Sequence, residues 1–267
     1  MAAGAAVKRI AFLLVLALAG GGAAASLTPQ QLEGVALAPP PGARLPEGLA
    51  FVDQLGRPAR LSPGPAPTLL LFADYTCRHL CGPGVTLTAG ALHDAGLVAV
   101  RDYRLVVVGL DQDGPDKARA FAADRLRGLP DVAREVRLLT GSPRAVAAAE
   151  AAVGYRAVYD APSDQFAHDA ASFVFTPDGR LSRVLPETAG TPALVRGAIE
   201  AAARGEALTP AEGSALQRIV TLCYGFAAAH GVHGRAIVAT LRLLAVLTVA
   251  GIALALWRLS RRARARA

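Results

Sequence analysis

The sequence predicts a layered α/β fold, in which helices cover the faces of a β-sheet. Three short apolar runs, Thr68–Ala73, Leu105–Leu110 and Ala171–Thr176, have the length and composition of buried strands. Segments with a helical pattern separate them. A turn at Pro177-Asp178-Gly179 then joins the last run to a further strand, Leu181–Leu185. This alternation, closed by a hairpin, is typical of a sheet flanked by helices.

The other elements follow in chain order. Leu27–Pro67 is rich in Pro and Gly, and we interpret it as a lead-in with an early hairpin around Ala50–Leu61. Ser142-Pro143 and Thr191-Pro192 are helix-start signals, because a hydroxyl side chain precedes a proline suited to the first turn. The expected helices are Val85–Ala95, Asp116–Leu126, Ser142–Ala152 and Thr191 to about Arg204, with a short strand at Val136–Leu139.

The positive charge is concentrated at the two ends of the chain. The 267 residues carry a formal net charge of +7. Between Ser26 and Gly234, however, 19 basic residues face 21 acidic ones, a net charge of −2. A high isoelectric point normally indicates a nucleic-acid-binding protein. Because the central region is slightly acidic, we expect no nucleic-acid partner, and the charge at the ends indicates membrane topology instead.

The N-terminal segment 1–25 has the pattern of a signal peptide. Lys8 and Arg9 precede the apolar run Ile10–Ala19, and Ala23-Ala24-Ala25 supplies small residues for cleavage. The apolar run is short for a membrane span, which needs about 20 residues. The alternative is an uncleaved N-terminal anchor.

A second apolar stretch, 236–257, predicts a transmembrane helix. Its 22 residues include one charge, Arg242, near the start, and they end at Trp257, a residue suited to the membrane interface. The basic tail 258–267 would lie in the cytoplasm by the positive-inside rule. We therefore expect a single-pass protein of the bacterial inner membrane, with an extracytoplasmic domain joined to its anchor by a juxtamembrane segment, 206–235. A buried core helix with a DNA-binding tail is the alternative.

Two cysteines follow the first strong strand. Cys77 and Cys81 form a C-x-x-x-C element at a strand-to-helix junction, and positions four apart on a helix face the same way. A helix N-terminus favours thiolates, which together with imidazole suit copper(I) or zinc. In an exported protein the same pair could form a structural disulfide. The spacing alone leaves both interpretations open.

Four separated stretches between Leu70 and Leu185 carry a family resemblance. They are Leu71 to Cys77 continued through Cys81, Asp111 to Ala118 with Phe121-Ala122, Leu139 to Ser142 with the later Val153-Gly154-Tyr155, and His168-Asp169 ahead of Ser172 to Phe175 and Pro177-Asp178-Gly179. In this order they resemble the Sco/SenC family of thioredoxin-like copper proteins. The resemblance implies a thioredoxin-like copper-binding domain at 68–205.

The resemblance also implies a copper site formed by Cys77, Cys81 and His168. It further implies delivery of copper to the copper-bearing subunit of cytochrome c oxidase, or reduction of that subunit's cysteines, with other copper chaperones as additional partners. Two departures stand out. Family members often carry proline after each cysteine, where this chain has Arg78 and Gly82, and many relatives have their anchor at the N-terminus.

Taken by themselves, the histidines, the loop aspartates and the third cysteine fit ordinary structural roles. His168 alone would be an ordinary loop histidine, and His79 and His93 fit solvent-facing positions. Asp111 and Asp113 fit loop-structuring roles, with support of the metal ligands from behind as the alternative. Cys223, near His230 and His233, is interpreted as an interfacial cysteine, with a copper relay or an intermolecular disulfide as alternatives.

A second function class uses the same cysteines. Cys77 and Cys81 could be the redox-active pair of a thiol–disulfide oxidoreductase or redox sensor that stores no metal, because fold alone does not decide function. His168 discriminates between the classes, since a copper site needs it and dithiol exchange does not. A peroxidase-like activity is a third option, which would need an accessible low-pKa cysteine with a resolving partner.

Overall fold

The computed structural model describes residues 34–76, 81–111, 114–161, 164–187, 190–208, 243–249, 251–252 and 258. Contacts divide the chain into two compact units. One is Pro29–Ala229, and the other combines Met1–Thr28 with His230–Ala267. Nearly all described residues belong to Pro29–Ala229, which is treated first.

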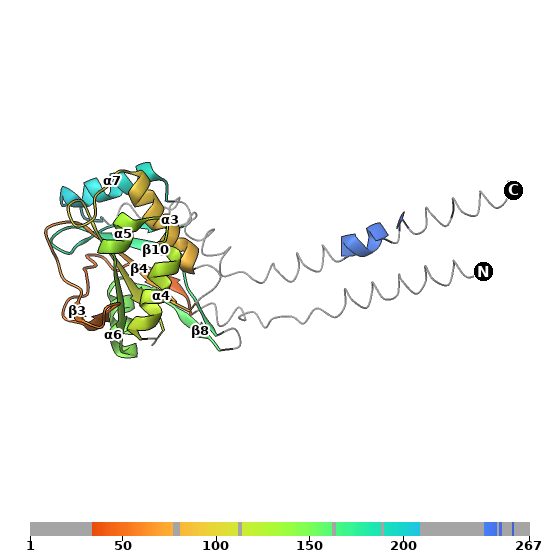
Figure 1. Cartoon of the computed structure of the whole chain (residues 1–267), viewed down its shortest axis with the longest axis horizontal. Coiled ribbons are helices and arrows are strands. Elements are labelled where there is room, and N and C mark those ends of the chain that lie inside the picture. The colour runs from red at the N-terminus through yellow and green to blue at the C-terminus, as the bar shows by residue number, and fades with distance from the viewer. Residues whose placement is uncertain are drawn as a thin grey trace. The chain divides into compact units, whose positions relative to one another are not determined.

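A seven-stranded mixed sheet forms the centre of this unit (Figure 1). Its order is β11 (Leu181–Pro186), β10 (Ala171–Phe175), β4 (Thr68–Ala73), β5 (Arg104–Gly109), β6 (Arg137–Gly141), β2 (Ala50–Asp53) and β3 (Pro58–Arg60). Strands β4, β5 and β6 run parallel, and the outer pairings are antiparallel. The predicted layered α/β fold is confirmed.

Five helices and two small strand pairs complete the described part of this unit. The helices are α3 (Cys81–Asp94), α4 (Pro115–Arg125), α5 (Pro130–Glu135), α6 (Pro143–Ala152) and α7 (Pro192–Ala203). The strand pairs are β1 (Ala36–Leu37) with β7 (Tyr155–Arg156), and β8 (Val158–Asp160) with β9 (Gln165–Ala167).

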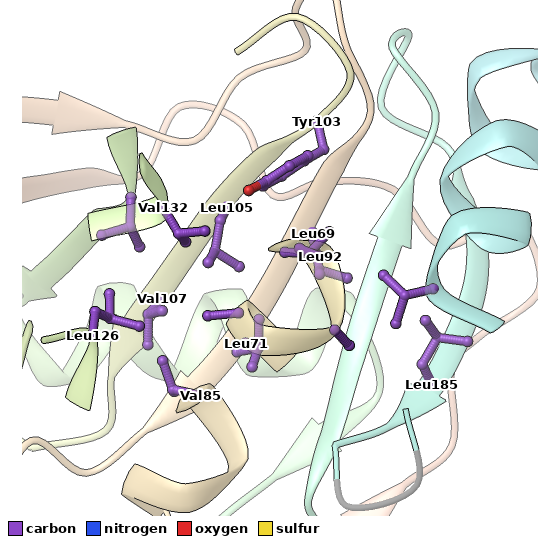
Figure 2. Close-up of a cluster of buried hydrophobic side chains, with 14 of the residues drawn as sticks. Leu69, Leu71, Val85, Leu92, Tyr103, Leu105, Val107, Leu126, Val132 and Leu185 are labelled. Carbon is purple, nitrogen blue, oxygen red and sulfur yellow. The ribbon is translucent and has the colours of Figure 1, made fainter. Parts of the chain in front are cut away.

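Alternate residues of β4 face opposite sides of the sheet, so the core has two halves. On one side Leu69 and Leu71 pack with α3 and α7, and Figure 2 shows them beside Leu92. On the other side Leu70 and Phe72 pack with residues of α6. All six residues of β4 are buried, which explains its unbroken apolar sequence.

The local start signals work as predicted, with small differences at element ends. Ser142 caps α6 by accepting a hydrogen bond from the Ala145 backbone N–H at 3.2 Å, and Thr191 caps α7 by accepting one from Leu194. Helix α3 begins at Cys81, four residues earlier than expected. Helix α5 was not expected, because its six residues carry too short a periodic pattern to be recognised.

The second unit is described only at 243–249, 251–252 and 258, where the backbone is helical. Among the described residues, no helix combines the length and apolar composition needed to cross a bilayer. The predicted signal peptide 1–25 lies outside the described residues, as does much of the predicted span 236–257. Both therefore stay predictions.

Candidate metal centre

Two of the residues predicted for function, Cys81 and His168, lie in chain segments next to strands that meet at the edge of the sheet where β4 ends. Strand β4 ends at Ala73, and α3 begins at Cys81. Strand β10 runs antiparallel to β4, with Ser172 opposite Leu71. The start of β10 therefore lies at the same edge as the end of β4, and this places His168, three residues before β10, on that edge.

Polar contacts shape the loop that leaves β4. Asp74 Oδ1 accepts hydrogen bonds from the backbone N–H and the hydroxyl of Thr76, both at 2.8 Å. Asp111, which follows β5, accepts a hydrogen bond through Oδ2 from the Tyr75 backbone N–H at 2.9 Å. Asp111 therefore has the predicted loop-structuring role, and the ends of two neighbouring strands are joined at this edge.

Tyr75 fixes the same loop from the inside of the protein. Its hydroxyl lies 2.9 Å from the carbonyl oxygen of Val107 and 3.1 Å from that of Leu139, and it donates to this pair. Burial, with a smaller effect of the Asp111 charge, raises the pKa of Tyr75 well above its usual value. Its hydroxyl therefore stays protonated and anchors the loop to β5 and β6.

His168 is partly buried and has defined hydrogen-bond partners. Its Nδ1 lies 2.7 Å from the Tyr155 hydroxyl and 3.0 Å from the carbonyl oxygen of Asp169. The rings of Tyr155 and His168 are 6.2 Å apart between centroids. The Nδ1 nitrogen of the imidazole is thus held by protein groups, and metal-binding histidines usually have one ring nitrogen held in this way.

Glu187 adds a buried carboxyl group to this edge. It follows β11 directly, is 3% exposed, and its backbone N–H donates to the carbonyl of Ala170 at 3.0 Å. Its Oε1 has no hydrogen-bond partner among the described residues. Burial raises the pKa of Glu187 well above its usual value. Burial without a hydrogen-bond partner for Oε1 therefore favours the protonated, uncharged form of this carboxyl.

Gly84 makes room for this carboxyl in the first turns of α3. A Cβ at position 84 would lie 3.1 Å from Glu187 Cδ and would overlap Oε2. Positions 81 and 84 are three residues apart, so their α-carbons lie on the same face of the helix. Glu187 thus touches α3 within one turn of Cys81.

The structure describes some of the predicted ligands and not others. The side chain of His168 is described, and Cys81 is placed as the first residue of α3. Cys77, Arg78 and His79 lie outside the described residues, as do Asp113, Cys223, His230 and His233. Within the described ranges, no cluster of three or more His, Cys, Asp or Glu side chains could hold a metal ion. The trio Cys77, Cys81 and His168 therefore stays a prediction.

His93 lies away from this edge. Its Nδ1 is 2.9 Å from Asp131 Oδ2 on the protein surface. The hydrogen bond and charge of Asp131 raise the pKa of His93. The predicted solvent-facing position of His93 is confirmed, and it has no part in the candidate site.

Comparison with known proteins shows the fold. No protein-family model matches the chain, and no curated protein gives a significant match. A candidate electron transfer protein from Aquifex aeolicus VF5 is 17% identical, with a TM-score of 0.55 over 62% of this chain and 96% of that chain. This likeness shows a shared α/β fold, a thioredoxin-like mixed sheet flanked by helices.

Sco/SenC family proteins are also among the structural neighbours. Arabidopsis thaliana ScoI with copper bound is 16% identical, with a TM-score of 0.48 over 60% of this chain and 98% of that chain. BsSco, a member of the Sco family of cytochrome c oxidase assembly proteins, is 20% identical, with a TM-score of 0.48 over 62% of this chain and 96% of that chain.

Sequence reasoning did not identify two residues of the site edge. Tyr155 belongs to one of the stretches that resemble the Sco/SenC family, but the sequence alone indicates no role for Tyr155 or Glu187. An acidic residue directly after an apolar strand is the signal that could have found Glu187, because groups at strand ends gather at one edge of the sheet. Nothing in the local sequence indicates that Tyr155 contacts His168.

Proposed function

We propose that this chain is an exported, membrane-anchored copper-binding assembly factor. It binds one copper ion through Cys77, Cys81 and His168 and passes it to the copper-bearing subunit of cytochrome c oxidase. The observation that carries the proposal is the position of His168. This histidine is held by Tyr155 and Asp169 at the edge where β4 ends and where α3 begins at Cys81.

The donor set suits copper(I). Two thiolates and one imidazole are soft-to-intermediate ligands, and three ligands leave room for an incoming group. Cys81 is at the N-terminus of α3, where the helix dipole stabilises a thiolate. Transfer would proceed by ligand exchange, in which acceptor thiolates replace the cysteines of this chain one after the other. The site is therefore suited to release as well as binding.

The membrane part of the proposal is supported by the described helical residues near the C-terminus. Leu243, Leu244 and Leu247 are between 54% and 60% exposed, although they are large and apolar. Thr248 satisfies its hydroxyl by donating to the Leu244 carbonyl at 2.8 Å. Helices with apolar exposed surfaces and internally bonded hydroxyls suit a lipid environment. We propose that 236–257 is an anchor for an extracytoplasmic domain.

Copper stoichiometry and affinity of the full-length chain test this proposal. The chain is purified anaerobically and titrated with copper(I) against a competing chelator. We expect about one copper per chain for the wild type and loss of tight binding in Cys77→Ala, Cys81→Ala and His168→Ala. Cys223→Ser and His93→Ala are matched controls that should bind normally. Undiminished copper in all three site variants would overturn the proposal.

A thiol–disulfide oxidoreductase is the second candidate, and the helix N-terminus at Cys81 favours it as well. In that case the cysteines exchange electrons with a partner disulfide and no metal is stored. His168→Ala separates the two functions: it should abolish tight copper binding but leave dithiol exchange intact. A wild-type chain that binds no copper and still reduces disulfides would favour the oxidoreductase.

A further inference from the structure

A cavity of about 280 Å³ lies at the edge of the sheet opposite the candidate metal centre. Arg104 begins β5 and Arg137 begins β6, and both side chains line this cavity. Strands β4, β5 and β6 run parallel, so their first residues share one edge of the sheet. The loop that follows β4 lies at the other edge. The cavity is therefore separate from the residues of the proposed copper site.

The charged groups around the cavity carry an excess of positive charge. Four arginines and two acids line it, and they are Arg57, Arg104, Arg134, Arg137, Asp53 and Glu135. Asp53 is paired with Arg57, at 3.1 Å between Oδ2 and Nε. Among the described residues, the other three arginines form no ion pair. Burial, with a smaller effect of the Arg137 charge, lowers the pKa of Arg104. An anion in this cavity would therefore be attracted to guanidinium groups that now repel each other.

Two buried hydrogen-bond donors of the lining have no acceptor in the described part of the chain. They are the hydroxyl of Tyr103 and Nε of Arg104. Tyr103 is 1% exposed, and Figure 2 shows its hydroxyl pointing toward Leu105 and Val132, which also line the cavity. Burial, with smaller effects of two nearby carboxylates, raises the pKa of Tyr103 to about 12, so the hydroxyl keeps its proton. Buried polar groups without a partner are rare in folded proteins, and acceptor oxygens of a ligand would satisfy these two donors.

The guanidinium of Arg104 is already fixed in position. Its Nη2 donates to the Ser62 carbonyl oxygen at 2.6 Å and to the Thr68 hydroxyl at 2.5 Å. Thr68 is the first residue of β4, so the side chain is tied to the same edge of the sheet that holds the cavity. A side chain that is ordered beforehand loses little conformational entropy when a ligand binds.

The rest of the wall is largely apolar. Leu105, Val106 and Val132 are buried residues of the lining. Val100 also lines the cavity but is 55% exposed, and its φ of 70° lies in the left-handed region that β-branched residues rarely adopt. The Val100 backbone N–H donates to the Tyr103 carbonyl oxygen at 2.7 Å, which holds this turn closed. Backbone strain of this kind persists where the surrounding structure fixes it, often beside a binding site.

We propose that this cavity is a second binding site, which takes a small organic carboxylate with an apolar body. Guanidinium groups bind carboxylates through paired N–H donors, and the Tyr103 hydroxyl supplies a further donor. The apolar wall favours a hydrocarbon body over a small hydrated anion such as phosphate. The volume is near the lower end of the range for ligand pockets, so the ligand is about the size of benzoate. The inference does not depend on copper binding.

The test is calorimetric titration of the full-length chain with benzoate. Benzyl alcohol has the same ring without the charge, and inorganic phosphate has charge without an apolar body, so these two are the comparison probes. Tyr103→Phe removes the unpartnered hydroxyl, and Arg137→Gln removes one positive charge. Tyr159→Phe and Arg127→Gln are matched controls, because neither residue lines the cavity. Tyr159 donates to Asp164 Oδ1 at 2.5 Å, and the side chain of Arg127 is 82% exposed.

We expect about one benzoate per chain, bound at least about tenfold more tightly than either comparison probe. Tyr103→Phe and Arg137→Gln should each weaken benzoate binding about tenfold or more, as for a lost hydrogen bond to a charged group, and the controls should bind normally. Without ligand, Tyr103→Phe should unfold at the same or a higher temperature, because it removes a buried hydroxyl that has no partner among the described residues.

Four results would overturn the inference. They are the absence of saturable benzoate binding, equally tight binding of benzyl alcohol or phosphate, unchanged benzoate binding in either site variant, and a lower unfolding temperature of ligand-free Tyr103→Phe. The first two concern the wild type alone, so they decide the matter even where a variant fails to fold.

Discussion

Asp53 and Glu187 are almost equally buried, at 6% and 3% exposed, but their surroundings are opposite. Asp53, at the end of β2, accepts hydrogen bonds from the backbone N–H groups of Leu55 and Arg57 at 2.9 Å and from Arg57 Nε at 3.1 Å. Glu187 has no partner for Oε1 among the described residues. The carboxyl that shapes the hairpin is satisfied, and the unsatisfied one lies at the candidate site.

The pKa values of Asp53 and Glu187 are shifted in opposite directions. Burial alone would raise the pKa of Asp53, but the hydrogen bonds from Arg57 and Leu55 outweigh it, so its pKa lies below the usual value. Glu187 has burial without compensation, and its pKa is raised. Unpartnered buried polar groups are rare in folded proteins and often mark functional sites. Asp53 therefore stabilises the fold through its hydrogen bonds, whereas burial of Glu187 is not offset by a hydrogen bond to Oε1.

Asp53→Ala should give the largest effect on stability. It removes three hydrogen bonds, two of them from the backbone N–H groups of Leu55 and Arg57 and one from the Arg57 side chain. Because each hydrogen bond contributes about 0.5–1.5 kcal/mol net, we expect a loss of about 3 kcal/mol in the free energy of unfolding. Chemical denaturation of the full-length chain measures it. A loss below about 1 kcal/mol would remove Asp53 from the comparison as a structural residue.

Gly84→Ala tests whether Glu187 packs as closely against α3 as described. The new Cβ would overlap the carboxyl, and we expect a loss of about 1–3 kcal/mol, typical of overpacking. Gly90 of the same helix is the control. No atom lies within 4 Å of its added Cβ, so Gly90→Ala should stabilise by about 0.5–1 kcal/mol through helix propensity. The cost at Gly84 should disappear when Glu187 is also alanine, and its persistence would contradict the described contact.

Glu187→Gln should change how stability depends on pH. In the unfolded chain Glu187 ionises near its usual pKa of 4.5, whereas in the folded chain it stays protonated to higher pH. The free energy of unfolding therefore falls as pH rises through this window, by up to about 1.4 kcal/mol per pH unit. The variant should lose this slope, as measured by denaturation at a series of pH values.

Asp53→Asn is the counterpart with the opposite sign. The pKa of Asp53 is lowered in the folded chain, so its contribution is present above its usual pKa of 3.8 and is lost as pH falls through the folded value. We expect the asparagine variant to lose stability at neutral pH but not in strong acid. If both variants changed the same pH range in the same direction, the contrast between the two carboxyls would be wrong.

The central strands and most helices could be predicted from sequence because their signals are local. The unbroken apolar run Thr68–Ala73 is β4 without any change of bounds, and Ser142-Pro143 marks the start of α6. The order of the strands in the sheet could not be predicted in this way. The place of β2 beside β6 depends on pairing between residues nearly ninety positions apart, which no local pattern reports.

In the candidate site, too, local sequence patterns do not report the long-range contacts. The prediction of His168 as a ligand comes from the family resemblance, because His168 alone would be an ordinary loop histidine. Its contact with Tyr155 spans 13 positions through two small strands, and the contact of Glu187 with Gly84 joins segments about a hundred residues apart. The ligands therefore stay a prediction from sequence, while the contacts of Tyr155 and Glu187 depend on tertiary packing, which no local pattern reports.

X-ray absorption spectroscopy at the copper edge tests the central claim most directly, because it counts the ligand atoms around the metal. The full-length chain is loaded anaerobically with about one copper(I) per molecule and compared with His168→Ala. We predict two sulfur ligands and one imidazole nitrogen in the wild type, with the imidazole contribution absent in the variant. Identical spectra for the two proteins, or a wild-type site without sulfur, would contradict the account.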